Sequence, residues 1–537
     1  MLEGRSDLGT HEVSNQPPSV ADRDLWRDDP VLRGHFAEGG ALARYGAAMG
    51  SLRMRSAARD ANRHPPELVL FDAGGRRLDE VHFHPAYHRF METSSAAGYH
   101  SIAWEDRADG HLRHAAMVYL ASQVEPGHCC PLTMTYAATP VLRRAAGLDG
   151  WVSGVLSRCY DPSVRPAAAK TGLTLGMAMT EKQGGSDVRA NATRAVADGA
   201  HWRLTGHKWF CSAPMSDGFL TLAQTGQGLT CFLVPRWLED ARNGIRIQRL
   251  KDKLGNRSNA SAEIEYQDAL AHRIGDEGEG IRTIVEMVHH TRLDTAIAPA
   301  GLMRAALREA HHWVRHRSAF QRLLIDQPLM RAVLADAALD WAGSLALGLH
   351  VAAHFDGGAA QDRALARIGV ALAKYLSNKL CPLVVTEAME VLGGMGYVED
   401  TPLPMLYREA PLNGIWEGSA NVICLDALRT LAKDPAAAEA LEAQFLAARG
   451  LHPAYDAALR AHRDRWAGAV AEAEARWFVE SAALLLTASV LLRRGPSALA
   501  DAYSASRLTP GRGRFYGALP AGQAGNLLDL CFPEQVF

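Results

Sequence analysis

The sequence predicts an α+β protein with four parts: an N-terminal helical domain, a small central β-barrel or sandwich, a helical bundle, and an extra helical C-terminal domain. Three observations lead to this prediction. The chain has 537 residues, which is too long for one hydrophobic core. Short β-friendly segments separated by glycine and aspartate occur only in the middle of the chain. Apolar residues at helical spacing dominate on both sides of that region.

The four predicted domains cover residues 1–171, 172–284, 285–434 and 435–537. In the first, His111–Gln123 has its apolar residues at helical intervals. In the third, Leu302–His316 and Met330–Leu349 have the same pattern. The strands of the second domain are expected in HWRLTGHKWF, GFLTLAQT, LTCFLVP, GIRIQRL and SAEIEYQD.

Composition excludes several classes of protein. Hydrophobic residues make up 48% and charged residues 22%, as in globular proteins, and the formal charge of −2 gives no general attraction to nucleic acid or membrane. The eight cysteines have no CxxC pair or metal-ligand spacing, which favours a reduced chain without a metal site. The apolar segment Ala482–Leu492 is too short to cross a bilayer. We therefore expect a cytoplasmic protein that does not associate with membranes.

The strongest local signal is Met177–Asp187, with the sequence MAMTEKQGGSD. Gly184 and Gly185 allow a close backbone approach to a ligand, and Thr180 and Ser186 add short hydroxyl groups. Such loops suit a phosphate or the polar edge of a flavin ring. On these residues alone, the segment could equally be a turn that ends a strand.

Four segments in order resemble the acyl-CoA dehydrogenase family. MAMTEKQGGSD is similar to its TEPxxGSD signature, and KWFCS at 208–212 to its flavin-facing strand. RHRSAFQRLLIDQ at 315–327 resembles the helix that reaches the FAD of a neighbouring subunit. EVLGGMGY at 390–397 and YREAPLNGIWEGSAN at 407–421 resemble the stretch that closes the site. The helical, β, helical order is also that of the family.

The resemblance implies FAD as the cofactor and assigns it a set of contacts. These are Met177, Met179, Thr180, Gly185, Ser186, Trp209, Phe210, Cys211, Ser212, Arg317, Gln327, Gly393, Gly394, Ile415, Trp416, Gly418, Ser419 and Asn421. The chain departs from the family pattern at three places: Lys182-Gln183 stands where proline is usual, Gln321 where glycine is usual, and Glu390 where glutamine is usual. The last two changes bear on the inter-subunit part of the cofactor site.

Glu417 is the expected catalytic base. Oxidation of an acyl thioester requires loss of an α-proton and hydride transfer from the β-carbon to flavin, so the protein must supply a positioned base. Glu417 follows Ile415-Trp416 and precedes Gly418, which fits a carboxylate in an apolar wall. The family's other base position corresponds here to Thr291, which cannot serve. The alternative is that Glu417 is a surface carboxylate at a helix N-terminus.

Residues 435–537 extend beyond the segment where ordinary family members end. Together with KLGNRSNAS at 253–261 and VSNQPP near the start, this extension resembles the AidB-like alkylation-response branch. That branch implies a homotetramer, binding of double-stranded DNA through the extension, and weak or secondary acyl-CoA dehydrogenation. Trp416 beside the base suggests a short or branched acyl group, but a bulky neighbour can equally line a long channel. A purely metabolic acyl-CoA dehydrogenase without DNA binding is the alternative, and a nitroalkane-oxidising relative is a third possibility.

The extension is not strongly basic as a whole. Between Leu441 and Phe537 there are ten arginines and nine acidic residues. The arginines are nevertheless concentrated late in the chain, where they could contact phosphates without reading bases. The same side chains could instead pair with acidic residues elsewhere in the protein. The candidates for DNA contact are Arg429, Arg493, Arg494, Arg507, Arg512 and Arg514.

Overall fold

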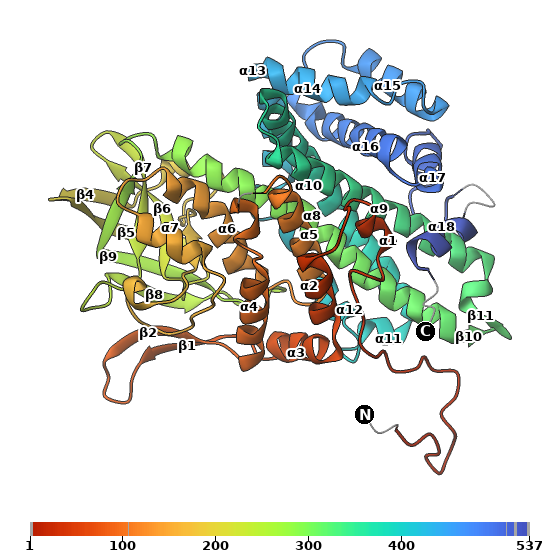
Figure 1. Cartoon of the computed structure of the whole chain (residues 1–537), viewed down its shortest axis with the longest axis horizontal. Helices are drawn as coiled ribbons and strands as arrows, with labels where there is room; N and C mark the ends of the chain where they lie inside the picture. The colour runs from red at the N-terminus through yellow and green to blue at the C-terminus, as the bar shows by residue number, and fades with distance from the viewer. Residues whose placement is uncertain (1–3, 106, 512, 520–523, 534–537) are drawn as a thin grey trace.

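The computed structural model describes residues 4–105, 107–511, 513–519 and 524–533. Figure 1 shows a β-domain at one end of the molecule and long helices at the other, with the N-terminal helices between them. The C-terminal helices lie against the long helices, away from the β-domain. The predicted fold, helical then β then helical with a helical extension, is confirmed.

The N-terminal region is helical except for one hairpin. Its helices are α1 Pro30–Arg33, α2 Ala41–Gly50, α3 Leu52–Arg63, α4 Pro85–Ala97, α5 Gly110–Ser122, α6 Cys129–Arg143 and α7 Asp149–Leu156. Strands β1 Glu67–Phe71 and β2 Arg77–His82 form an antiparallel pair that a mainly helical assignment misses. Asp72 makes the turn, since its Oδ1 accepts from the amides of Gly74 and Arg76.

The central domain is a closed barrel. Its strands are β3 Leu175–Ala178, β4 Arg194–Asp198, β5 His201–Ser212, β6 Gly218–Thr225, β7 Gly228–Pro235, β8 Ile245–Leu250 and β9 Ser261–Ile274. Strands β6, β4, β5, β9 and β7 are hydrogen-bonded in that order, and β7 pairs again with β6, which closes the ring. Strand β3 joins β6 in parallel, and β8 lies on β9. Apolar residues such as Phe219, Ile264 and Tyr266 fill the interior.

The helical bundle begins at Gly280, before the predicted boundary at residue 285. Its elements are α8 Gly280–His316, β10 Ser318–Ala319, β11 Arg322–Leu323, α9 Pro328–Asp356, α10 Ala360–Leu392, α11 Gly394–Tyr397, α12 Leu403–Glu409 and α13 Ala420–Lys433. Helices α8, α9 and α10 pack on one another, and α8 and α9 also pack on α5. The bundle therefore joins the N-terminal helices in one core.

The extension adds α14 Pro435–Leu446, α15 Pro453–Arg465, α16 Ala475–Arg494, α17 Ser497–Arg507 and α18 Ala524–Cys531. Helix α14 starts where Asp434 caps it, with Pro435 in the first position. Helices α16, α17 and α18 pack on α9, and α16 also packs on α10. Leu486 of α16 and Trp341 of α9 belong to the same buried cluster. The extension is thus continuous with the core of the bundle.

Among the described residues, three segments are long and apolar enough, by length and composition, to span a membrane: α9, α10 and Glu472–Arg494. In their most apolar windows, 89%, 78% and 67% of the residues are buried inside the protein. Packing in the helical core accounts for that apolar character.

Candidate active site

Glu417 stands in a backbone turn between α12 and α13. Its φ is 58° and that of Gly418 is 98°, so two successive residues have the left-handed conformation. For a residue with a side chain this conformation costs about 1–2 kcal/mol. Such strain persists where surrounding contacts fix it, and it is concentrated at functional sites.

Three side chains from two long helices hold this turn. Thr291 of α8 donates from Oγ1 to Oε2 of Glu417 at 2.7 Å. Its neighbour Arg292 donates from Nε to the Glu417 carbonyl at 3.3 Å and is fixed by Asp426 at 2.7 Å. Lys374 of α10 donates to the carbonyl of Trp416 at 2.9 Å and also to that of Asn413. The position that the family uses as an alternative base therefore supplies a hydrogen bond to Glu417.

The surroundings make Glu417 a stronger base than an exposed carboxylate. Burial raises the pKa of Glu417, while the Thr291 hydrogen bond and the charges of Lys374 and Arg292 act in the opposite direction. Burial lowers the pKa of Lys374, and the charge of Glu417 opposes that change. A general base is most effective when its pKa approaches the working pH. The alternative of a fully solvated surface carboxylate does not fit this environment.

The two glycine- and hydroxyl-bearing segments meet at one edge of the barrel. The Trp209 amide donates to the Thr180 carbonyl at 2.8 Å, which joins MAMTEKQGGSD to KWFCS. Below this contact, Lys208 Nζ lies 2.7 Å from Glu181 Oε1, with both side chains fully buried. Burial would raise the pKa of Glu181, but Lys208 and neighbouring amides bring it to about 2. This ion pair positions the loop, and the sequence reasoning did not identify it.

Gln183, which together with Lys182 stands where the family usually has proline, stabilises the diglycine loop through hydrogen bonds. Gln183 Nε2 donates to Glu181 Oε2 at 2.8 Å and to the Ala190 carbonyl at 3.0 Å, which holds the turn from within. A Cβ on Gly185 would lie 2.6 Å from Thr180 Oγ1, so glycine is required there. In the part of the chain that the structure describes, neither the Thr180 nor the Ser186 hydroxyl has a hydrogen-bond partner. Both are free to bind a ligand.

Strand β5 presents its last residues to two different sides. Phe210 is 45% exposed, whereas Cys211 is fully buried in the barrel interior. The assignment of Cys211 as a cofactor contact is therefore corrected: only its backbone can reach a ligand, because its side chain points into the barrel. Trp209 lies under Lys251, whose Nζ is 3.4 Å from the ring centroid.

Cys130 of α6 links the barrel edge to Glu417. Burial raises the pKa of Cys130 to about 11, Lys253 lowers it, the Glu417 carboxylate adds to the rise, and a hydrogen bond with Ser212 lowers it. The charge of Glu417 thus acts on a thiol of α6, the helix that packs on β3 of the barrel. Met177 and Met179, at the end of β3, are half-buried in the apolar layer that α6 shares with the barrel.

The segment around Glu417 carries the remaining predicted contacts of this group. Ile415 is 65% exposed, and Trp416 is held by Asn413 Oδ1, which accepts from its ring at 2.7 Å. Ser419 and Asn421 are exposed at the start of α13. Asn421 Oδ1 accepts from Arg476 Nε at 2.7 Å, so the extension contacts this segment directly.

Four predicted FAD contacts lie elsewhere: Arg317, Gln327, Gly393 and Gly394. Arg317 ends α8 and donates to the Asn15 carbonyl at 2.8 Å, and Gln327 starts α9. Thr291 and Arg317 are 26 residues apart on α8, which corresponds to about 39 Å. One chain does not bring these residues to the space beside Glu417.

Gln321, where the family usually has glycine, has a backbone conformation that glycine adopts more readily. Phe320 and Gln321, in the turn between β10 and β11, have φ values of 51° and 65°, a conformation that favours glycine or asparagine. Phe320 is 93% exposed. Glu390 is also exposed, at the end of α10.

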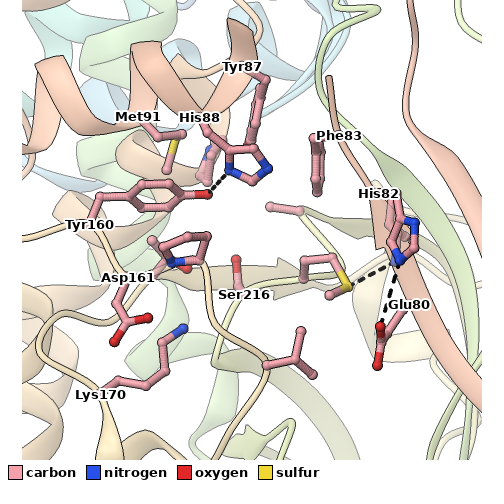
Figure 2. A pocket seen from close by; sticks show the side chains of 17 residues that line it. Glu80, His82, Phe83, Tyr87, His88, Met91, Tyr160, Asp161, Lys170 and Ser216 are labelled. Carbon is pink, nitrogen blue, oxygen red and sulfur yellow. Dashed lines mark hydrogen bonds and ion pairs between the residues drawn. The ribbon is translucent and has the colours of Figure 1, made fainter. Parts of the chain in front are cut away.

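A separate cavity of about 390 Å³ adjoins the barrel edge. Figure 2 shows that Phe83, Tyr87, Tyr160 and Met91 form its walls. The Tyr160 hydroxyl lies 2.8 Å from His88 Nδ1. Ala213 and Pro131 line the cavity and directly follow Ser212 and Cys130 in the chain.

The predicted DNA-contacting arginines differ sharply in environment. Arg507 is buried between Asp336 and Asp340 of α9, with Nε 2.8 Å from Asp340 Oδ1. The assignment of Arg507 as a DNA contact is therefore wrong: its guanidinium group joins the extension to the bundle. Arg493 is half-buried and donates to Gln444 at 2.5 Å. Arg429, Arg494 and Arg514 are exposed, and Arg512 lies outside the described residues.

Three known domain families match successive parts of the chain. Residues 15–162 match the N-terminal domain of the adaptive response protein AidB. Residues 176–269 match the middle domain of acyl-CoA dehydrogenases, and residues 278–432 match their C-terminal domain.

Individual relatives cover most of the chain. AidB of Escherichia coli is 46% identical over 465 residues, 84% of this chain and 86% of that protein. Acyl-CoA dehydrogenase family member 11 of Caenorhabditis elegans is 33% identical over 436 residues, 75% of this chain and 70% of that protein. The crystal structure of Caenorhabditis elegans ACDH-11 with C11-CoA superposes with a TM-score of 0.82 at 27% identity, covering 94% and 92% of the two chains. The apo form of Bd2924 gives 0.81 at 29% identity, covering 90% of this chain and all of that one.

The fold and the site define an enzyme of the acyl-CoA dehydrogenase type, an oxidoreductase class whose members are flavoproteins. The chain belongs to the acyl-CoA dehydrogenase family and is closely related to AidB.

Proposed function

We propose that this protein binds FAD and uses Glu417 to remove the α-proton of an acyl-CoA. The observation that carries the proposal is the fixed carboxylate: Glu417 has a strained left-handed backbone and accepts from Thr291 at 2.7 Å, in a setting where burial raises its pKa. Flavin would supply the acceptor for the hydride from the β-carbon. The protein's part is to hold the base and to exclude water.

The residues at the barrel edge fit the cofactor. The free hydroxyls of Thr180 and Ser186 suit the polar atoms of a flavin and its phosphates. Gly185 keeps the loop open, because a side chain there would meet Thr180 at 2.6 Å. The exposed ring of Phe210 and the exposed Ile415 offer apolar surface to the flat ring system. Met177, Met179, Gly418 and Ser419 complete the proposed contacts.

The position of Arg317, Gln327, Gly393 and Gly394 supports a homo-oligomer, and we propose the homotetramer. Arg317 lies about 39 Å along α8 from Thr291, and Gly393 lies about 29 Å along α10 from Lys374, so this group would serve the cofactor of a neighbouring subunit. Exposure of the Phe320 ring at the same end of α8 supports contact with another copy.

The acyl-CoA substrate is proposed on the enzyme class and on the ACDH-11 complex with C11-CoA. Trp416 beside the base favours a short or branched acyl group, because the Asn413 hydrogen bond restricts the ring to one orientation. The test is anaerobic mixing of the purified protein with a panel of acyl-CoA esters. Flavin bleaching with short or branched esters is expected. Absence of bleaching with every ester would refute the dehydrogenase proposal.

We also propose that the extension contacts double-stranded DNA without sequence preference. The support is the resemblance to AidB and the exposure of Arg429, Arg494 and Arg514. Such contacts would release counterions and weaken with salt. A gel-shift assay with duplex DNA across a salt series is the test. Lack of binding at low salt would favour the alternative, a metabolic dehydrogenase without DNA binding.

A further inference from the structure

A second cleft lies between the N-terminal segment, α3, α8 and the loop after α11. Its volume is about 440 Å³. Four arginines line this cleft: Arg23, Arg55, Arg59 and Arg308. We call it the arginine cleft. Thr291 and Arg308 are 17 residues apart on α8, or about 25 Å, so this cleft is separate from the space beside Glu417.

Two of the four arginines have carboxylate partners. Arg23 Nη1 lies 2.5 Å from Glu309 Oε1, and Arg308 Nη2 lies 3.0 Å from Asp28 Oδ2. The second nitrogen of the Arg308 guanidinium, Nη1, is buried and has no hydrogen-bond partner among the described residues. A buried donor without a partner costs about 1–3 kcal/mol.

The other two arginines have only carbonyl partners. Arg55 donates to Gly50 and Val20, each at 3.1 Å, and also to Ala21. Arg59 donates to the Asp400 carbonyl at 3.1 Å. Within the described chain, neither forms an ion pair. The charge of Arg55 is partly offset by Glu309 and Asp22, whereas that of Arg59 has no ion-pair partner among the described residues.

The remaining charges near the cleft do not remove the excess. Asp400 lines it, but its contact with Arg59 is through the backbone, and the Asp22 carboxylate accepts from the Leu52 amide at 2.7 Å. Burial lowers the pKa of Arg55 to about 10, and repulsion from Arg23 adds to the decrease. Burial and the charges of Arg23 and Arg304 lower the pKa of Arg308 to about 10 as well. Both side chains stay protonated at neutral pH.

We propose that the arginine cleft binds an organic phosphate. Guanidinium groups are planar and match phosphate oxygens in pairs, and several of them around one cleft suit a group with two negative charges. The apolar part of the wall, including Leu25, Leu52 and Met405, would cover the organic part of the ligand. This site goes beyond the proposed dehydrogenase and DNA functions.

A ligand there would also connect two parts of the fold. Arg59 and Arg63 hold the carbonyls of Asp400 and Glu399, in the loop that joins the Gly393-Gly394 turn to α12. A phosphate bound to Arg55 and Arg59 would stiffen α3 against this loop.

The test is isothermal titration of the full-length flavin-loaded protein with inorganic pyrophosphate and, separately, with inorganic phosphate. Wild type should bind pyrophosphate more tightly than phosphate. The double variant Arg55→Gln with Arg59→Gln should bind at least about tenfold more weakly, because two charged donors are lost. Arg53→Gln, exposed on the same helix and outside the cleft, should bind like wild type.

Three outcomes would overturn the proposal. Wild type could bind neither anion. The Arg53→Gln variant could lose as much affinity as the double variant, which would indicate general charge attraction. The double variant could release its flavin, which would assign the cleft to the cofactor of a neighbouring subunit. A thermal unfolding scan of each variant verifies that loss of binding is not loss of fold.

Discussion

The turn around Glu417 and the C-terminal extension differ in how they use charged side chains. Glu417 is drawn into a partly buried site by contacts from α8 and α10, and its charge stays available to a ligand. Arg507 is drawn just as firmly into the interface of α17 with α9, where two aspartates neutralise it. The arrangement around Glu417 keeps a reactive carboxylate accessible. The arrangement around Arg507 neutralises the guanidinium charge in ion pairs that join the extension to the bundle.

Glu417 and Arg507 differ in the charged and polar groups that contact them. Glu417 meets a neutral hydroxyl and two cations at some distance, so burial still dominates its pKa. Arg507 meets two carboxylates directly, and they raise its pKa further above the ordinary value despite burial. A charged residue with fully matched partners is structural, whereas an incompletely matched one remains available for chemistry.

The largest effect in the extension is expected for Arg507→Leu. Removing this guanidinium breaks its buried ion pairs with Asp336 and Asp340, which should cost about 3–5 kcal/mol of unfolding free energy. Urea unfolding followed by circular dichroism measures the change. The control Arg494→Leu, at an exposed position, should stay within about 0.5 kcal/mol of wild type. Equal stability of the two variants would contradict the structural role of Arg507.

A smaller effect is expected for Thr291→Val. The Thr291 hydrogen bond stabilises the ionised form of Glu417, so its loss should raise the pKa of Glu417. The base would then be protonated over a wider range, and the acid limb of the kcat/KM profile should move to higher pH. Near that limb the rate should fall by roughly tenfold. Thr295→Val, one turn later on α8, should leave the limb in place, since the Thr295 hydroxyl donates to the Arg292 carbonyl and not to Glu417. An unshifted limb in Thr291→Val would separate Thr291 from the base.

The smallest effect is expected from the exposed arginines of the extension. Changing Arg494 and Arg514 together to glutamate should weaken duplex DNA binding to a similar degree for any sequence. The dependence of affinity on salt should also become less steep. Gel-shift titrations at several salt concentrations measure both. Unchanged affinity at low salt would show that DNA, if bound, contacts other residues.

The order of helical and β regions follows from periodicity, and the long helices and barrel strands lie where the pattern predicts them. The β1–β2 hairpin was missed, although Glu67–Phe71 and the Asp72 turn carry a strand signal within a helical context. The site was predictable only in part. Glu417 could be chosen by resemblance, but Thr291, 126 residues away in sequence, could not be recognised as its partner.

Burial explains most of what the sequence could not indicate. Lys208 and Glu181 are 27 residues apart, and only the closure of the barrel brings them together without water. Arg507 and Asp340 are 167 residues apart. A count of arginines in the extension therefore could not distinguish a guanidinium in a buried ion pair from one exposed to solvent. Cys211 and Phe210 are adjacent, yet strand geometry sends one side chain inward and exposes the other.

Single-turnover flavin reduction in Glu417→Gln tests the central claim most directly. The variant keeps the shape of the side chain and should keep its flavin, while losing the group that removes the α-proton. Reduction by an acyl-CoA that bleaches wild type should slow by about 10²–10⁴-fold. Reduction of the Gln variant at the wild-type rate would contradict the assignment of Glu417 as the base.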